Sequence, residues 1–303
     1  MPGRMNTDKY FPIAGKISEA PFMAISTMSS HIRMSRSTIS RCIRRMYEEQ
    51  RLVGPWLSMN PHENYRQYVY LMNFSDPLTM FEGLKTFPHV MYHAITFGEW
   101  NTLIVAEKPL DFSVLKGFQS EIWRGEKGYT HTPPVARISW DQSWKEVKQR
   151  LETIPLKRDE TKTKLPILDW EEKEWKLYHA FKSNMRQPVK PILKTLRIRY
   201  EPFIGWKKSL PEHCGIHTEF YPQSVDTFTN HCLLLKCKYI RAVKELFSLF
   251  PTTPIFVEMG ESMLVYVKTT SDMTRNLIRM VYGMKERGIV EDARYAVIFK
   301  EHG

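Results

Sequence analysis

The sequence lacks the features that would place a chain in a membrane or in an oxidising compartment. Its 303 residues contain no apolar run close to the roughly 18 residues that a membrane-spanning helix needs. The opening residues, MPGRMNTDKYF, contain no apolar signal-peptide core, so we expect a cytoplasmic protein. The 4 cysteines are too scattered for a disulfide framework, and reduced thiols are expected. No phosphate-binding loop, paired-carboxylate motif or nucleophile-and-base spacing is visible, so we assign no catalytic residue.

The sequence also lacks a recognisable metal-binding pattern. Metal-competent side chains occur in the second half, but a zinc site needs about four ligands that converge at short range. Cys232 and Cys237 lie at an odd spacing on a predicted strand, so their side chains face opposite sides. We therefore expect neither a metal site nor a cofactor. The residues considered are His213, Cys214, His217, His231, Cys232 and Cys237.

Positive charge, by contrast, is abundant. Lysine and arginine number 44 against 33 aspartates and glutamates, which gives a formal charge of +11 and a pI near 9.4. A surplus of this size favours polyanionic partners, nucleic acid first and an anionic membrane surface second. Charge alone does not identify the partner, because basic enzymes exist as well.

The stretch from Ser35 to Gly54, SRSTISRCIRRMYEEQRLVG, concentrates this charge on a predicted helix. Ser35 is a good N-cap, because its hydroxyl can accept a hydrogen bond from an amide of the first turn. Apolar residues then recur at helical spacing, and a second short amphipathic helix precedes them between residues 21 and 34. Two short helices joined by a tight turn predict a helix-turn-helix. The alternative is an ordinary surface helix with a solvated cationic face. The apolar positions are Ile25, Met28 and Ile32 on the first helix, and Ile39, Cys42, Ile43 and Met46 on the second.

The exposed face of this second helix carries the residue types that contact DNA. Arginine can bind guanine with two hydrogen bonds, serine and threonine reach bases or phosphates, and further arginines neutralise phosphates. We expect double-stranded DNA as the partner. The predicted base-reading residues are Arg36, Ser37, Thr38, Ser40 and Arg41, and the predicted phosphate contacts are Arg33, Arg44, Arg45, Arg51, Lys207 and Lys208.

The rest of the first half alternates between strand and helix patterns. Residues 52–60 predict two short wing strands around Gly54-Pro55, and residues 1–20 give no clear first helix because Pro12 and Gly15 interrupt it. Strands are then predicted at 65–74, 90–97 and 100–106, helices at 76–87 and 112–123, and an extended segment at 128–135. This βαββαβ order is that of a ferredoxin-like domain.

The second half repeats this order. A Phe-Pro pair followed by a Gly-Glu turn occurs at Phe87-Pro88 and Gly98-Glu99, and again at Phe250-Pro251 and Gly260-Glu261. Shared order and spacing indicate an internal duplication. The predicted fold class is α+β, with two winged helix-turn-helix domains, each followed by a ferredoxin-like domain. The first winged helix-turn-helix is expected at 1–60 and the first ferredoxin-like domain at 61–138. A linker at 139–168 holds a helix at 140–151. The second winged helix-turn-helix is expected at 169–225 and the second ferredoxin-like domain at 226–303. The second copy has helices at 169–184, with Asp169 as N-cap, 189–196, 199–210, 240–250 and 273–287, and strands at 217–221, 231–237, 255–259, 263–267 and 291–299.

This layout, together with the Ser-Arg-Ser-Thr-Ile-Ser-Arg-x-Ile-Arg-Arg-Met-x-Glu-Glu stretch from Ser35, resembles the leucine-responsive, or feast–famine, regulators (Lrp/AsnC). The resemblance implies a transcriptional regulator whose β-rich domains dimerise and bind small effectors, often amino acids. It implies an effector-site turn at Gly98, Glu99, Gly260 and Glu261. A tandem chain could form the family's dimer within itself, and could also form a homodimer.

The second copy departs from the family pattern. Its counterpart helix carries Glu201, Pro202, Phe203 and Gly205 where the first copy has short polar residues and arginines. Glu201 repels phosphate, and Pro202 removes an amide donor. The second winged helix is therefore expected to be degenerate, with Lys207 and Lys208 left to contact DNA backbone.

Two alternatives remain. The related siroheme decarboxylases use the same layout as an enzyme that acts on a tetrapyrrole. Pro21-Phe22, the FGEWN hairpin at 97–101, and His89 and His93 beside Tyr92 resemble that branch weakly. A protein–protein interaction module on the same folds is the other alternative.

Overall fold

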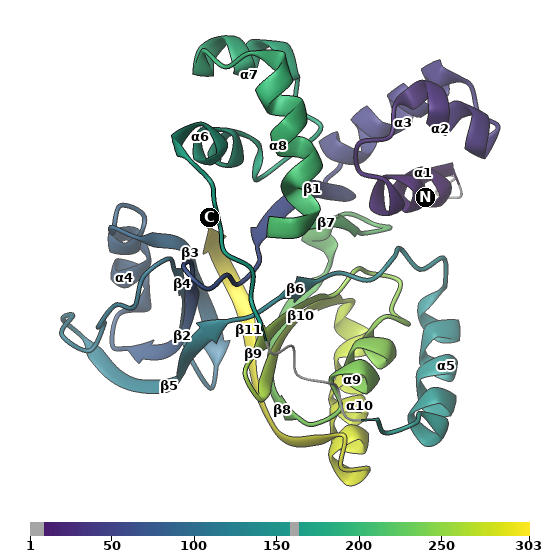
Figure 1. Ribbon diagram of the computed structural model, residues 1–303. Coiled ribbons are helices and arrows are strands. Elements are labelled where there is room, and N and C mark those ends of the chain that lie inside the picture. The colour runs from purple at the N-terminus through teal and green to yellow at the C-terminus, as the bar shows by residue number, and fades with distance from the viewer. Residues whose placement is uncertain (1–8, 158–163) are drawn as a thin grey trace.

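The molecule has two layers, which Figure 1 shows one above the other. The structure, a computed structural model, describes residues 9–157 and 164–303. The predicted charged segment of the linker and the first eight residues thus lie largely outside the described residues. One layer holds two helix-turn-helix units, and the other holds a large sheet with helices on its outside. The first unit is α1 (Tyr10–Glu19), α2 (Ile25–Ile32) and α3 (Arg36–Glu48), and the second is α6 (Glu172–Phe181), α7 (Val189–Leu196) and α8 (Tyr200–His213).

The first unit has the first helix that the sequence did not clearly provide. Pro12 lies in the first turn of α1, where the missing amide costs no intrahelical hydrogen bond. Ile13 and Ile17 of α1 are fully buried against α2 and α3. In α3 the Ser35 hydroxyl accepts a hydrogen bond from the amide of Thr38 at 3.2 Å. The predicted N-cap and the predicted apolar stripe of α3 are both confirmed.

The second unit matches its predicted helices closely, with two corrections. The N-cap of α6 is Glu171 and not Asp169, because Glu171 and Glu174 form a reciprocal capping box that holds the first turn. Pro202 lies in the first turn of α8, where its missing amide costs no intrahelical hydrogen bond. Pro211 does not end α8 but lies within its last turn.

The predicted wing of the first unit is wrong. Residues 52–59 form a single strand, β1 (Leu52–Met59), with a register shift between Val53 and Trp56. This strand pairs with β7 (Cys214–Phe220), which follows α8 in the second unit. Each unit thus supplies one strand to a shared two-stranded antiparallel sheet. A strand that finds its partner about 160 residues away cannot be told from a local hairpin by periodicity.

The other layer contains a nine-stranded sheet in the order β5-β2-β4-β3-β11-β8-β10-β9-β6. The strands of each half occur in the same order, β5-β2-β4-β3 and β11-β8-β10-β9, as the duplication predicts. The first set is β2 (Gln67–Phe74), β3 (Val90–Gly98), β4 (Thr102–Ala106), β5 (Phe118–Lys127) and β6 (Thr130–His131). The second set is β8 (Thr229–Cys237), β9 (Ile255–Met259), β10 (Ser262–Thr269) and β11 (Val290–His302).

The sheet closes on itself. The strand β5 at one edge continues into β6 at the other, and Gly128 and Tyr129 between them bond to Glu258 of β9. The amide of Gly128 donates to the Glu258 carbonyl at 2.7 Å, and the Glu258 amide donates to the Tyr129 carbonyl at 2.9 Å. The result is a barrel to which both halves contribute, and its interior holds apolar residues from both.

One helix and one strand of the first half were predicted wrongly. The segment predicted as a helix at 112–123 begins as a loop, and β5 starts within it at Phe118. The extended segment predicted at 128–135 is reduced to the two residues of β6. In place of the missing helix, Phe112 and Leu115 of the loop cover the outer face of the sheet. The periodic apolar positions therefore did serve to cover that face, but from a loop.

Among residues 9–157 and 164–303, four helices pack on the outside of the barrel. The first half has α4 (Pro77–Leu84), where the N-cap Asp76 accepts a hydrogen bond from the Thr79 amide at 3.0 Å. The second half has α9 (Ile240–Phe247) and α10 (Thr274–Glu286). The predicted linker helix, α5 (Trp140–Thr153), packs against both of these through Val147. Within residues 9–157 and 164–303, no helix combines the length and the apolar character needed to cross a bilayer.

Candidate functional site

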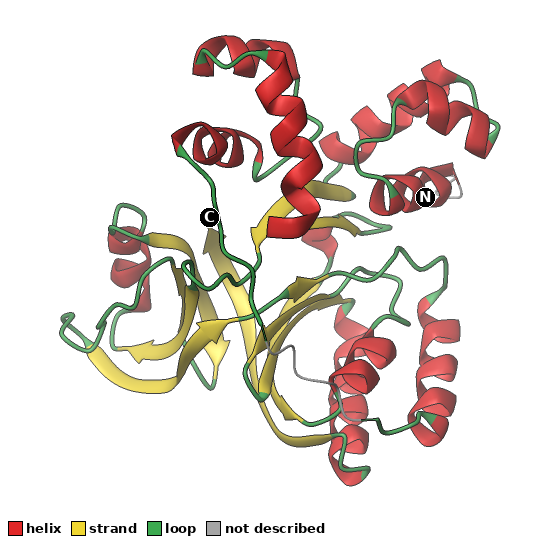
Figure 2. Ribbon diagram, in the orientation of Figure 1, coloured by secondary structure: helices red, strands yellow, loops and turns green. Residues whose placement is uncertain are grey.

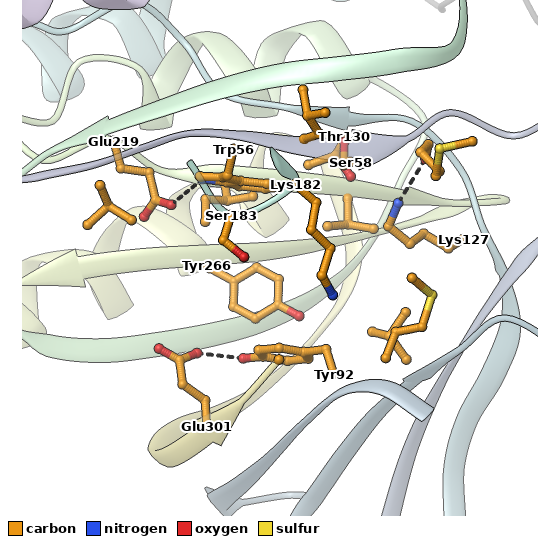
Figure 3. A pocket seen from close by; sticks show the side chains of 18 of the residues that line it. Trp56, Ser58, Tyr92, Lys127, Thr130, Lys182, Ser183, Glu219, Tyr266 and Glu301 are labelled. Carbon is orange, nitrogen blue, oxygen red and sulfur yellow. Dashed lines mark hydrogen bonds between the residues drawn. The ribbon is translucent and has the colours of Figure 1, made fainter. Parts of the chain in front are cut away.

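A cavity of about 690 Å³ lies where the two layers meet. Its roof is formed by β1 and β7 and by the end of α6, and its floor by the ends of barrel strands. Both halves of the chain line it, and Figure 3 shows the polar side chains that point inward. A volume of this size is typical of a site for a small organic ligand. The apolar walls are Val53, Leu57, Met59, Val69, Met91, Val105, Val225, Ile255 and Val257.

Three lysines from different elements reach this cavity: Lys127 at the end of β5, Lys182 after α6 and Lys268 near the end of β10. The Lys127 ammonium donates to the Met59 carbonyl at 3.3 Å, and the Lys268 ammonium lies 5.0 Å from the centre of the Tyr221 ring. Figure 3 shows Lys182 extending toward the rings of Tyr266 and Tyr92. Across the described residues, none of these ammonium groups forms an ion pair with a carboxylate.

The two glutamates that line the cavity are, by contrast, already held. Glu219 accepts hydrogen bonds from Trp56 Nε1, at 2.7 Å, and from the Tyr221 hydroxyl. Glu301 accepts one from the Tyr92 hydroxyl at 2.6 Å. Burial and the Glu301 carboxylate raise the pKa of Tyr92 well above its ordinary value, so its hydroxyl stays protonated. The cavity therefore combines satisfied carboxylates with unpaired ammonium groups.

A serine and a histidine meet at one end of the cavity, but they do not form a nucleophile and base. Ser58 of β1 and His217 of β7 are 2.7 Å apart, from Oγ to Nε2. A Cβ at Gly215, opposite Ser58, would lie 2.4 Å from His217 Nε2, so only glycine leaves room for the pair. Burial lowers the pKa of His217 to about 3. An imidazole that resists protonation so strongly is a poor general base, and the pair serves to join the two strands.

The predicted base-reading face of α3 is on the surface. Arg36, Ser37 and Arg41 are exposed, Thr38 and Ser40 are half-buried, and the side chains of Ser37 and Thr38 also contact the capping Ser35 hydroxyl. The predicted phosphate contacts Arg33 and Arg44 are exposed as well. These side chains therefore share one accessible face, as a DNA-reading helix requires.

Three predicted phosphate contacts are engaged within the fold. Arg51 is only 6 % exposed, pairs with Glu49 and donates to the Pro222 carbonyl, so its prediction as a phosphate contact is wrong. Arg45 pairs with Glu49 on the helix surface. Lys207 is half-buried, with its ammonium 4.1 Å from the centre of the Phe22 ring, whereas Lys208 is exposed.

Lys207 belongs to a clamp between the two helix-turn-helix units. Beside it, Arg186 donates to the carbonyl of Pro21 at 2.9 Å and to that of Met23 at 3.2 Å. These contacts fix the loop between α1 and α2 against the second unit. The Pro21-Phe22 pair is therefore an interface element in this structure.

The two predicted effector-site turns have different surroundings. Gly98 and Glu99 end β3 beside β11, and the Glu99 carboxylate accepts a hydrogen bond from the Tyr295 amide at 3.1 Å. Gly260 and Glu261 form an open turn, and Glu261 lines a smaller cavity of about 320 Å³ at the opposite end of the barrel. The structure does not bring the two turns together, and neither lines the larger cavity.

The metal-competent residues are also dispersed. His62, which belongs to no metal-binding sequence pattern, meets His213 across the two halves at 3.1 Å, from Nε2 to Nδ1. All 4 cysteines are free and buried. In the part of the chain that the structure describes, no three metal-competent side chains gather into a site.

Sequence reasoning missed the cavity lysines because they are far apart in the chain and share no spacing. Lys127 and Lys182 were unremarkable among 44 basic residues. Only the pairing of β1 with β7 above the barrel brings them together, and no local pattern predicts that pairing.

No protein-family model matches this chain, and no curated protein matches it. Among solved structures, the chain is similar to the crystal structure of the siroheme decarboxylase NirDL, with 11% identity, a TM-score of 0.47, and 97% of this chain and 91% of that chain covered. It is also similar to the crystal structure of NirDL in complex with an iron-uroporphyrin III analogue, with 10% identity, a TM-score of 0.47, and 97% of this chain and 92% of that chain covered. Membership of the feast–famine regulators remains a prediction.

Proposed function

We propose that this protein binds a carboxylate-bearing, largely apolar small molecule in the cavity between its two layers. The observation that carries the proposal is the convergence of three unpaired lysines on one cavity of about 690 Å³. An ammonium group in a partly desolvated site is stabilised by an anionic partner, and these lysines have none within the described fold.

The walls restrict the ligand further. Aliphatic residues and the rings of Trp56, Tyr92, Tyr178 and Tyr266 cover most of the surface, so the body of the ligand should be apolar and suited to contact with aromatic rings. A carboxylated tetrapyrrole, the ligand class of the enzyme alternative in the sequence analysis, has these properties. It is therefore the first class to test.

The proposal is tested by titrating the protein with coproporphyrin III and following the change in its absorption and fluorescence. We expect saturable binding at one site per chain. Lys182→Met should weaken it by about tenfold or more, as the loss of a charge-assisted hydrogen bond does. Lys145→Met is the matched control, because Lys145 is an exposed lysine of α5 away from the cavity. Equal affinities for both variants and the wild type, or no binding at all, would refute the proposal.

The same experiment separates a binding protein from an enzyme. Mass spectrometry of the tetrapyrrole recovered after incubation should show the added compound unchanged if the protein only binds it. Loss of carboxyl groups, measured as carbon dioxide per chain, would support the enzyme alternative.

DNA binding by α3 is a second proposed function, which a specific observation favours. Arg33, Arg36, Arg41 and Arg44 are exposed on one helix-turn-helix unit, and α3 is well capped and presents an open face. On α8, the exposed Glu201 and Pro202 stand at the corresponding position, so sequence reading would come from α3 alone. Lys208 could add backbone contact.

Selection of bound sequences from a random duplex library tests this second function. Arg41→Ala should lower specific affinity by about 1–3 kcal/mol and relax the sequence preference at one position. Lys190→Ala on the exposed surface of α7 serves as a charge-matched control. Unchanged site preference in a folded Arg36→Ala, Arg41→Ala variant would exclude α3 as the reader.

A further inference from the structure

We infer that the cavity recognises acid groups on two opposite sides of its ligand, through two subsites that each pair a lysine with a side chain whose buried oxygen atom has no hydrogen-bond partner among the described residues. The inference rests on the proposed small-molecule function and specifies the ligand class. It follows from where Lys127, Thr130, Asn230 and Lys268 lie.

The first subsite is at the bend between β5 and β6. Lys127 and Thr130 are close in sequence, and both line the cavity. Residue Thr130 is 9 % exposed, and its side-chain hydroxyl has no hydrogen-bond partner among the described residues. The Lys127 ammonium has only the Met59 carbonyl, at 3.3 Å. A hydroxyl and an ammonium with spare donors, both facing one cavity, can hold a carboxylate between them.

The second subsite is on the neighbouring strands β8 and β10. Asn230 and Lys268 are direct partners in this antiparallel pair, so their side chains project from the same face of the sheet. Both line the cavity, and the amide oxygen of Asn230 has no partner among the described residues. Because the two ends of an amide are nearly identical in size, the group can turn to present its NH₂ to an acid.

The two subsites lie on opposite sides of the cavity. The Lys268 ammonium lies over the Tyr221 ring, and Tyr221 donates to Glu219. Figure 3 shows Glu219 and Lys127 on opposite sides, with Lys182 between them. The two cavity-lining glutamates, Glu219 and Glu301, both already accept hydrogen bonds from the protein. An occupant with acids at both sides matches the positions of Lys127 and Lys268, and Lys182 lies between the two subsites.

The test compares two flat probes that differ in where their acids lie. Coproporphyrin III carries carboxylates around the whole ring, and protoporphyrin IX carries them on one edge. We expect the full-length protein to bind coproporphyrin III at least tenfold more tightly. Lys127→Met and Lys268→Met should each weaken the binding of coproporphyrin III by about tenfold. Only one of the two variants should weaken the binding of protoporphyrin IX, because the acids of that probe can occupy one subsite at a time.

Thr130→Val supplies a milder test, since it removes only the hydroxyl. Its effect on coproporphyrin III should be strongly non-additive with Lys127→Met and additive with Lys268→Met, because only the first pair shares a subsite. Lys145→Met is again the control.

The outcomes separate this inference from the proposed function. If both probes bind with equal affinity and each lysine variant weakens both to the same degree, the cavity binds anions but the two-sided inference is wrong. If neither probe binds the wild type, the proposed function fails and this inference with it. Circular dichroism and unfolding curves identify any variant that fails to fold, and Thr130→Val, nearly isosteric, then decides the first subsite.

Discussion

Lys127 is a cavity residue whose charge depends strongly on its position in the fold. Burial lowers the pKa of its ammonium group to about 8, from an ordinary value of 10.5. Between these two pH values the unfolded chain holds a proton that the folded chain has lost, so the free energy of unfolding rises with pH. Below pH 8 the folded protein carries an incompletely solvated charge, and a bound carboxylate would offset that cost. Charged groups that destabilise the folded protein when no ligand is bound are common at functional sites.

This property gives a pH prediction for ligand affinity. The affinity for coproporphyrin III should be constant between pH 6.5 and about 7.5 and then fall as the pH rises through 8, because Lys127 loses its charge. Lys127→Met should bind more weakly at pH 7 and show no such fall near pH 8. Fluorescence titrations at several pH values measure both. A fall of equal size in the variant would mean that another group titrates.

At the scale of single elements, the sequence predicted the helices and strands that are specified by signals within a few residues. The capped helices α3 and α4 and the strand β9 were placed closely, because N-caps and apolar stripes act within a few residues. The helix predicted at 112–123 failed because the same apolar spacing fits a loop that covers a sheet, followed by strand β5. Strand β1 was misread as half of a wing, because its partner β7 comes from the other half of the chain.

The two Gly-Glu turns have the same sequence but different tertiary surroundings, so they provide a matched pair of substitutions. A Cβ at Gly98, where φ is +152°, would lie 2.4 Å from the Tyr295 carbonyl oxygen. A Cβ at Gly260, where φ is +62°, would meet nothing within 4 Å. Gly260→Ala should therefore cost about 1–2 kcal/mol of unfolding free energy for its positive φ alone. Gly98→Ala should cost at least about 3 kcal/mol, because strain and collision add.

Urea unfolding of the two glycine variants measures the difference directly. Equal losses of unfolding free energy would show that the residues of β11 around Gly98 shift to accommodate the new methyl group.

The candidate site shows the same division between local and long-range information. The exposed arginines of α3 could be selected from the sequence because one helix presents them, whereas the cavity lysines required the tertiary structure.

At the scale of the whole molecule, the two halves share every major sheet. β1 pairs with β7, β3 pairs with β11, and β6 pairs with β9. The barrel interior mixes Leu71 and Leu103 of the first half with Leu234 and Leu264 of the second. The duplicated units therefore associate within one chain. Separation would expose strand edges and apolar surface in both halves, which is strongly unfavourable.

We predict that the chain remains a single folded particle after a cut between the halves. A protease site placed within residues 158–163, followed by cleavage, should leave both fragments together on size-exclusion chromatography with light scattering, at the mass of the intact chain. The paired strands and the shared core hold them, while the cut removes only the covalent connection. The unfolding midpoint should become dependent on protein concentration, because reassociation is then bimolecular.

The β1–β7 contact contributes to this association. Gly215→Val would push a side chain into His217 and Ser58, so it should lower the unfolding midpoint of the cut protein. It should also weaken coproporphyrin III binding, since Ser58 and the rest of β1 form the roof of the cavity. Fragments that separate at micromolar concentration would show that the shared sheets are too weak to hold the halves, and the cavity between them would then depend on the covalent connection.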